Sequence, residues 1–292
     1  MRANFCGNRG WKSLLKLAKR RLKLRPAVAV MKATVVTTYK EWMAYRSHMA
    51  VSLFVGPVFF LTQVFIWRAV YSTRTTLNGL TLEQMLTYYG ISAVINYLTY
   101  DSADWDLQWL IRTGGFLTFM LRPVTYSYYA LSQKIGHRIL AVWVELFPIY
   151  LIFFFLFRIN LIPAAPGWAA LSILLSFLLV FLTNYCIGIS AFWLTKTDGL
   201  RRAFQTMRDL SAGSIIPLTF FPEAMQKILF FLPFQFITYV PTRVFIGSYE
   251  LAGIKLTIPE VVGLQFGAVL VMFGVYKILW HFGIKRFTGV GA

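Results

Sequence analysis

The sequence contains few of the residues with which proteins bind metals or nucleotides or form disulfides. Its 292 residues include two cysteines, three histidines and eleven acidic residues, and no segment matches the phosphate loop G-x-x-x-x-G-K-[ST]. Cys6 and Cys186 lie far apart, so no disulfide framework is predicted. The histidines, His48, His137 and His281, form no H-E-x-x-H motif. These absences exclude ATP binding by that loop, and we expect a protein without enzymatic activity or a cofactor of its own.

Charged residues are also scarce. Only 14% of the chain is charged and 58% is hydrophobic, against roughly 25% charged in ordinary soluble domains. This composition predicts a membrane protein with several spans. A formal net charge of +18 would indicate nucleic acid in a soluble chain, but in membrane proteins Lys and Arg gather near anionic lipid headgroups on the cytoplasmic side. We therefore expect membrane lipid as a partner and no nucleic acid.

The hydrophobic runs predict an all-α integral membrane protein with six transmembrane helices. Their approximate ranges are 49–70, 82–100, 139–157, 168–194, a fifth beginning at Arg208, and 261–281. Basic residues concentrate in the amino-terminal segment, in the second and fourth connections and at the carboxyl end. The positive-inside rule then places both termini in the cytoplasm.

Two segments precede the first span. Residues 1–26 are basic and lack the apolar core of a signal peptide, which predicts a retained cytoplasmic tail. Residues 27–46 carry apolar residues at helical spacing and predict an amphipathic elbow helix, or an extension of the first span. The membrane domain is then residues 27–292.

A polar stripe marks the second predicted span. Gln84, Tyr88, Ser92 and Asn96 follow at steps of four, which places them on one helical face. A polar face in lipid must turn inward. It can line a substrate path or form hydrogen bonds with neighbouring helices. Glu145, inside the third predicted span, is likewise either a path residue or a structural ion-pair partner.

Three carboxylates follow the second span. Asp101, Asp104 and Asp106 could bind a cation, but no His, Cys or Asn accompanies them in the order of a calcium loop. We expect a solvated acidic face here.

The most informative stretch is residues 209–247. It begins like a membrane span, but Pro217 interrupts the pattern and the two apolar pieces that follow, 223–232 and 234–246, are too short to cross about 30 Å of hydrocarbon. Broken apolar helices at membrane depth need protein or water around them. We expect a full fifth span and then a re-entrant helical hairpin, the alternative being an interfacial loop. The predicted outer hydrophobic gate consists of Pro217, Phe220, Phe221 and Pro222.

Residues 211–247 resemble the last third of type-2 ABC exporter permeases. Their sequence is SAGSIIPLTFFPEAMQKILFFLPFQFITYVPTRVFIG. In that family a fifth span ends at a proline-rich break, and a short helical hairpin and a sixth span follow. Leu121-Arg122-Pro123 is a second matching point, and the resemblance extends over roughly residues 30–285. It rests on the order and spacing of segments, since none of its motifs is as specific as a phosphate loop.

This resemblance implies the transmembrane subunit of an ATP-driven exporter in a prokaryotic cytoplasmic membrane. Such permeases form dimers of identical or related chains and work with separate ABC ATPase subunits, which bind the ATP and Mg. A coupling helix between spans two and three would map to about residues 107–120, and its candidate contact residues are Trp109, Arg112, Phe116 and Arg122. A structural or assembly subunit and a secondary transporter remain alternatives, although the latter typically shows inverted repeats and more charges within its spans.

Overall fold

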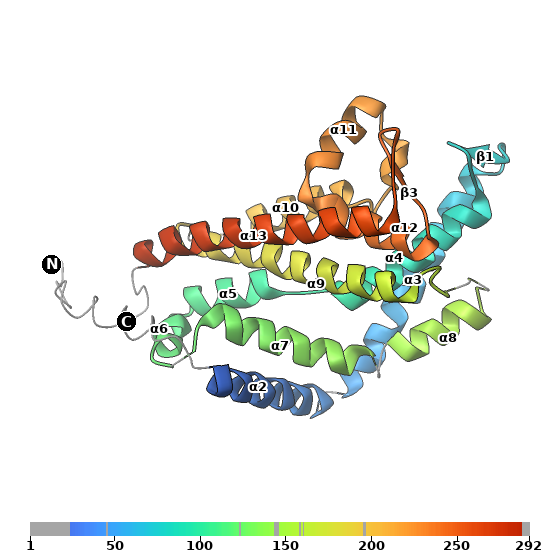
Figure 1. The fold of residues 1–292 in the computed structure, drawn as a ribbon. Helices are drawn as coiled ribbons and strands as arrows, with labels where there is room; N and C mark the ends of the chain where they lie inside the picture. Colours follow the sequence, from blue (N-terminus) through green and yellow to red (C-terminus); the bar gives the residue numbers. More distant parts are fainter. Residues whose placement is uncertain are drawn as a thin grey trace.

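The computed structural model describes residues 24–44, 46–122, 124–142, 146–157, 159, 161–194 and 197–287. Helices dominate this part of the chain, with two short β-hairpins. Figure 1 shows the long helices lying roughly side by side, while the segment around α11 and β3 projects from one side of the bundle. Most of the predicted basic tail lies outside the described residues, and α2 begins at Leu24.

The helices α9 (Pro166–Ile189) and α13 (Ile258–Arg286) form the centre of the bundle. Among the described residues, Pro166–Phe192 and Ile258–Arg286 are the two helical segments long and apolar enough to cross a membrane, and Gly56–Val70 is a shorter apolar helix. By length and composition, the described residues therefore show two of the six predicted spans clearly. The α9 helix is mostly buried and α13 mostly exposed, so α9 is the core helix.

The helices α3 (Arg46–Val70) and α4 (Leu82–Thr99) agree with the first two predicted spans. They are joined by a hairpin of β1 (Thr76–Leu77) and β2 (Leu80–Thr81), whose turn residues Asn78 and Gly79 both have positive φ, the backbone that an Asn-Gly hairpin turn favours. Thr81 and Gln84 then form a capping box at the start of α4. Gln84 thus caps its helix, whereas the sequence placed it on the polar path.

A second group of helices packs on the ends of α9 and α13. It comprises α5 (Ala103–Arg112), α6 (Gly115–Met120) and α7 (Tyr126–Ala141). Gly114 adopts a left-handed backbone with φ 75°, which lets the chain reverse between α5 and α6. Phe116 of α6 contacts the rings of Tyr126, Phe192 and Trp280, with centroids 5.5 to 6.1 Å apart.

The third predicted span is not one described helix. The helix α7 ends at Ala141, and α8 (Phe147–Phe155) has Pro148 in its first turn. Glu145 lies outside the described residues.

A helix, α2 (Leu24–Ala44), covers most of the range of the predicted elbow helix, and it packs lengthwise along α7 (Figure 1). Contact is close because Gly136 has no side chain: a Cβ there would lie 2.9 Å from the Val35 carbonyl oxygen. Thr38 is buried at this contact, whereas Val28 and Tyr39 are exposed. The described helix thus packs against protein on one face.

The fifth span predicted from Arg208 overlaps a described helix only at its first residues. The helix α10 (Asp198–Ser211) has 14 residues, about 21 Å at 1.5 Å per residue, and it ends before Gly213, whose φ is 79°. Broken structure follows: η3 (Leu218–Phe220), α11 (Glu223–Phe231), η4 (Pro233–Phe236), α12 (Tyr239–Ile246) and a hairpin of β3 (Tyr249–Leu251) and β4 (Ile254–Leu256). We call residues 212–256 the broken segment.

Candidate functional site

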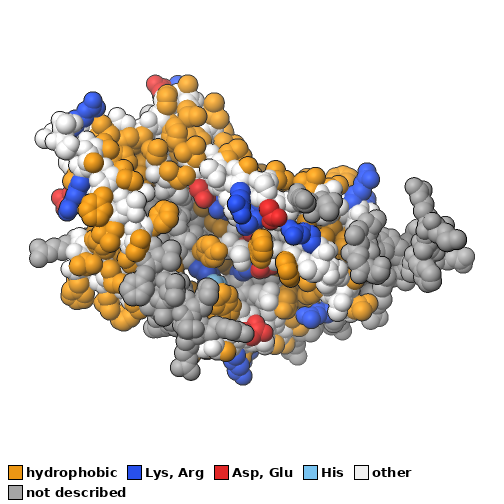
Figure 2. Space-filling model, turned by 180° about the vertical axis from the view of Figure 1, so that it is seen from behind, with side chains coloured by type: hydrophobic (Ala, Val, Ile, Leu, Met, Phe, Trp, Pro, Cys, Tyr) orange, Lys and Arg blue, Asp and Glu red, His pale blue; other side chains and the backbone are white. Residues whose placement is uncertain are grey.

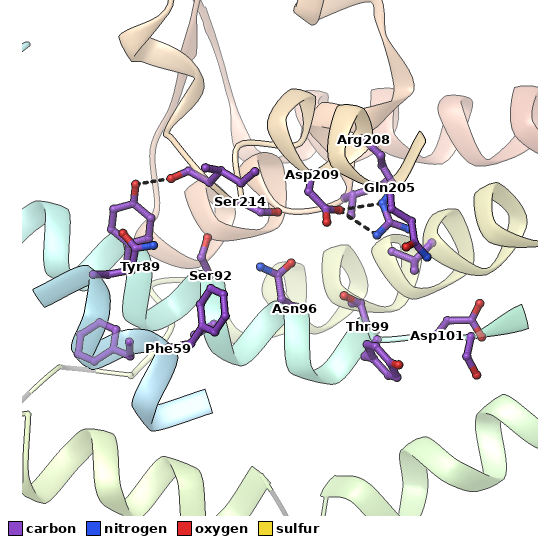
Figure 3. Close-up of a pocket in the computed structure, with 18 of the residues that line it drawn as sticks. Phe59, Tyr89, Ser92, Asn96, Thr99, Asp101, Gln205, Arg208, Asp209 and Ser214 are labelled. Atoms are coloured by element: carbon purple, nitrogen blue, oxygen red, sulfur yellow. Dashed lines mark hydrogen bonds and ion pairs between the residues drawn. The ribbon is translucent and has the colours of Figure 1, made fainter. Parts of the chain in front are cut away.

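A cavity of about 730 Å³ lies between α3, α4 and the chain from α10 to the break. Figure 3 shows residues from these elements converging on it. On the face drawn in Figure 2, charged side chains gather near the middle and hydrophobic side chains surround them. The residues that line the cavity include Phe59, Phe60, Gln63, Tyr89, Ser92, Asn96, Thr99, Tyr100, Asp101, Asp104, Arg201, Gln205, Arg208, Asp209, Ser214 and Ile215.

Three residues of the predicted polar stripe of α4, Tyr88, Ser92 and Asn96, face the broken segment, whereas Gln84 is exposed. The Tyr88 hydroxyl donates a hydrogen bond of 2.7 Å to the Gly213 carbonyl, and Asn96 Oδ1 accepts one of 2.7 Å from the Thr238 hydroxyl. The hydroxyls of Ser92 and Thr242 lie 3.2 Å apart. Ser92 and Asn96 also line the cavity, whereas Gln84 and Tyr88 do not. The stripe therefore combines helix contacts with cavity lining.

Side chains cap the free backbone carbonyls of the broken segment. The Tyr89 hydroxyl donates to the Ile215 carbonyl at 2.8 Å, and the Ser176 hydroxyl donates to the Ile237 carbonyl. Gln265 of α13 is fully buried and donates to the carbonyls of Phe236 and Ser172, both at 2.9 Å. Unpaired carbonyls cannot face hydrocarbon. This capping is the condition under which broken helices are tolerated inside a membrane.

Tyr89 is a cavity residue that the sequence did not single out. It follows Tyr88 and so falls outside the four-residue steps of the stripe. Nothing in the sequence distinguishes its hydroxyl from those of the neighbouring polar residues, and its partner carbonyl becomes identifiable only in the fold.

The four predicted gate residues do not line the cavity. Pro217 is buried, and the Phe220 ring packs against Trp67 of α3 with centroids 5.6 Å apart. Phe221 is partly buried and Pro222 is exposed. The predicted gate residues therefore contact α3 through Phe220 and do not themselves close the cavity.

The prediction that Asp101, Asp104 and Asp106 form a solvated acidic face is wrong for the first two, which are buried. Asp101 and Asp104 are 6% and 1% exposed. Asp101 accepts a hydrogen bond from Asn184 Nδ2 at 3.2 Å, and Asp104 accepts one from Gln205 Nε2 at 2.8 Å. Burial raises the pKa of both carboxyls, while Lys134 near Asp101 and Arg201 near Asp104 act in the opposite direction.

These carboxylates are buried because α5 folds closely onto α9. A Cβ at Gly188 of α9 would lie 3.1 Å from Leu107 Cβ and 3.2 Å from the Asp104 Cα, so a side chain there would push α5 away by a few tenths of an ångström. Asp106 stays partly exposed and pairs with Lys134 at 2.5 Å. No group of three metal-ligating side chains occurs among the described residues.

The helix α10 has its polar side inward. Arg208 donates to Asn184 Oδ1 at 2.5 Å and pairs with Asp209 at 2.8 Å, and Arg201 lies 3.8 Å from Asp104. The outward side exposes three apolar residues together with Arg202 and Thr206; the apolar ones are Leu200, Met207 and Leu210. A helix in water would show the reverse arrangement. The outer face of α10 therefore suits lipid or another protein chain.

The predicted coupling residues separate into surface and core. Trp109 is 56% exposed, and Arg112 pairs with Asp198 of α10 at 3.3 Å. Phe116 is only 2% exposed, so it cannot contact a partner directly. Arg122 is exposed and its guanidinium lies over the Phe119 ring.

Residues 58–291 match the model of a family described as ABC-2 family transporter protein. The match covers most of the chain, and the protein belongs to this family of transporter membrane components. Neither a curated protein nor a solved structure gives a significant match.

Proposed function

We propose that this member of the ABC-2 family is the permease subunit of an ATP-driven exporter. It would act as a dimer with separate ABC ATPase subunits, in a prokaryotic cytoplasmic membrane, with both termini in the cytoplasm. The observation that carries the proposal is the cavity beside α4, where polar side chains line one wall and simultaneously cap the broken segment. A substrate path needs a polar surface at membrane depth next to elements that can rearrange.

The proposed path runs along α4 past Asn96 and Ser92 toward the break. Phe59 and Phe60 of α3 provide apolar walls, and the side chains of Gln205 and Asp209 lie at the other end. The charged groups at that end are paired with one another, as for Arg208 with Asp209. The lining therefore suits an amphipathic substrate without a strong demand on its net charge.

Movement of the ATPases would enter through α5. Trp109 offers an exposed apolar contact, and the Arg112–Asp198 ion pair joins α5 to α10. The helix α10 in turn carries Gln205, which holds Asp104 and lines the cavity. A shift of α5 would thus change the cavity through two polar contacts with α10.

A second permease chain would close the open side of the cavity. Two helices expose apolar side chains that such a chain could cover. On α3 these are Val58, Phe59 and Phe65, and on α10 they are the three outward apolar residues described above. A C2 dimer buries the same surface of both partners, so one apolar face can serve both chains. Whether the partner is an identical or a related chain decides only the symmetry of the path.

The test is affinity purification in mild detergent, followed by mass identification of the proteins that accompany the chain. We expect an ABC ATPase at about one copy per permease and ATP hydrolysis by the complex. Transport by the purified chain in vesicles without any ATPase would overturn the proposal.

A further inference from the structure

A second cavity, of about 690 Å³, lies between α2, α5, α6 and α7 and shares Tyr100 and Ser102 with the lining of the first. We call it the aromatic groove. Residues Trp42, Trp105, Trp109, Phe119, Tyr126 and Tyr129 supply its rings. The family match assigns nothing to this place.

Arg122 is the distinctive charge of the aromatic groove. Its guanidinium carbon lies 5.3 Å from the Phe119 ring centroid and 5.8 Å from that of Tyr129. Among the described residues Arg122 takes part in no ion pair, whereas Lys134 in the same groove pairs with Asp106 at 2.5 Å. Stacking on rings occupies the face of a guanidinium and leaves its N–H edge free, and that edge matches two phosphate oxygens.

The other charges in the groove balance one another. Glu41 and Asp106 are the acidic residues of its lining, and Lys134 and Arg122 the basic ones. The lining has no net formal charge, so an anion would be drawn in by Arg122 itself and not by a general positive field. Burial lowers the pKa of His137, beside Trp42, to about 3, so this imidazole is neutral near pH 7.

The walls of the groove suit an amphiphile. Trp105 and Trp109 are both exposed and stack with an interplanar angle of 17°. Indole rings, apolar with one polar edge, are typical of the region between lipid headgroups and acyl chains. The groove also joins residues directly after the second predicted span, Tyr100 and Ser102, to residues before the third, where the proposed topology puts the inner membrane surface.

We propose that the aromatic groove binds one phospholipid of the inner leaflet, with its phosphate on Arg122 and its glycerol region along the tryptophans. This proposal rests on the topology proposed above but not on transport or on the ATPase. It also gives Arg122 a role different from a direct contact with the ATPase.

The experiment is native mass spectrometry of the detergent-purified chain titrated with dioleoyl phosphatidylethanolamine. We expect one saturable lipid per chain, and binding at least about tenfold weaker in Arg122→Gln, since hydrogen bonds to charged groups contribute about 1.5–3 kcal/mol. Arg286→Gln is the matched control: it removes an exposed arginine at the end of α13 that lines neither cavity. Equal lipid binding by wild type and Arg122→Gln would overturn the proposal, as would equal weakening in both variants.

Two further measurements sharpen the result. Inorganic phosphate at the lipid's concentration should not displace the lipid; displacement would show that the tryptophan walls contribute nothing and would contradict a lipid site. Arg122→Lys keeps the charge but loses the planar fork, so it should bind several-fold more weakly than wild type, and it carries the test if Arg122→Gln does not fold. The amount of ATPase that co-purifies with each variant is measured in parallel. A variant at Arg122 that loses the ATPase but still binds the lipid would contradict the lipid site and indicate that Arg122 contacts the ATPase.

Discussion

The pair α9 and α13 and the broken segment satisfy their backbones in opposite ways. Each long helix pairs its carbonyls within itself, so its stability depends on few outside groups. The broken segment depends on α4, α9 and α13, whose Tyr88, Ser176 and Gln265 cap its carbonyls. A displacement of any of these helices must therefore act on the broken segment. The difference teaches that the broken segment depends on side chains of its neighbours for hydrogen bonds that the long helices make within themselves.

Substituting Gly213, at the start of the broken segment, should lower the free energy of unfolding more than any other change proposed here. Gly213 has φ 79°, and a Cβ there would lie 3.0 Å from the Tyr88 hydroxyl and 3.2 Å from Tyr239 Cβ. Backbone strain and crowding together should lower the free energy of unfolding of Gly213→Ala by about 3 kcal/mol. Gly267→Ala in α13, where no atom lies within 4 Å of the new Cβ, is the control and should be slightly stabilising. Thermal unfolding in detergent measures both, and equal values would remove the contrast.

Gln265→Leu should have the next largest effect. It removes donors to the carbonyls of Phe236 and Ser172 at a fully buried position. We expect a loss of about 2 kcal/mol in the free energy of unfolding, since hydrogen bonds between membrane helices each contribute modestly. Phe266→Leu, at the adjacent exposed position, should change it by less than about 0.5 kcal/mol. A loss confined to the Phe266 variant would contradict the capping role.

Asn96→Leu tests the cavity side of α4. The variant leaves the Thr238 hydroxyl without its acceptor and makes the wall apolar. We expect about 1 kcal/mol of destabilisation and several-fold lower transport by the reconstituted complex, with ATPase co-purification retained. Unchanged transport would show that the polar stripe is a packing contact only.

Replacing Trp109 and Arg112 together by alanine should have the smallest effect on stability. Both lie at the surface, and an exposed ion pair such as Arg112–Asp198 contributes about 1 kcal/mol or less. The expected result is loss of the co-purified ATPase at a nearly unchanged unfolding temperature. Retention of the ATPase would place the coupling surface elsewhere.

Much of the fold follows from hydrophobic runs that pair their own backbones. The ranges of α3, α4, α9 and α13 agree with the predicted spans within several residues, and the position of the break follows from its prolines. These features depend on local chemistry, which a sequence displays directly.

The rest depends on contacts between distant segments. The burial of Asp101 and Asp104 requires α5 to fold onto α9, and in the sequence only Gly188 hints at that approach. The end of α10 at Ser211, only a few residues into the span predicted from Arg208, precedes Gly213, which packs closely against Tyr88. Trp109 of α5 and Phe116 of α6 are both aromatic residues of the predicted coupling segment, and only the tertiary structure distinguishes the core residue from the surface one.

The reversed faces of α10 have a consequence for counting membrane segments in sequences of this kind. A hydropathy scan averages over every residue of a helix, whereas a bilayer meets only the side turned toward it. Although Arg208 contacts Asn184 and Arg201 contacts Asp104 on the inner side, α10 would be scored as hydrophilic, while Leu200 and Met207 are exposed on its outer side.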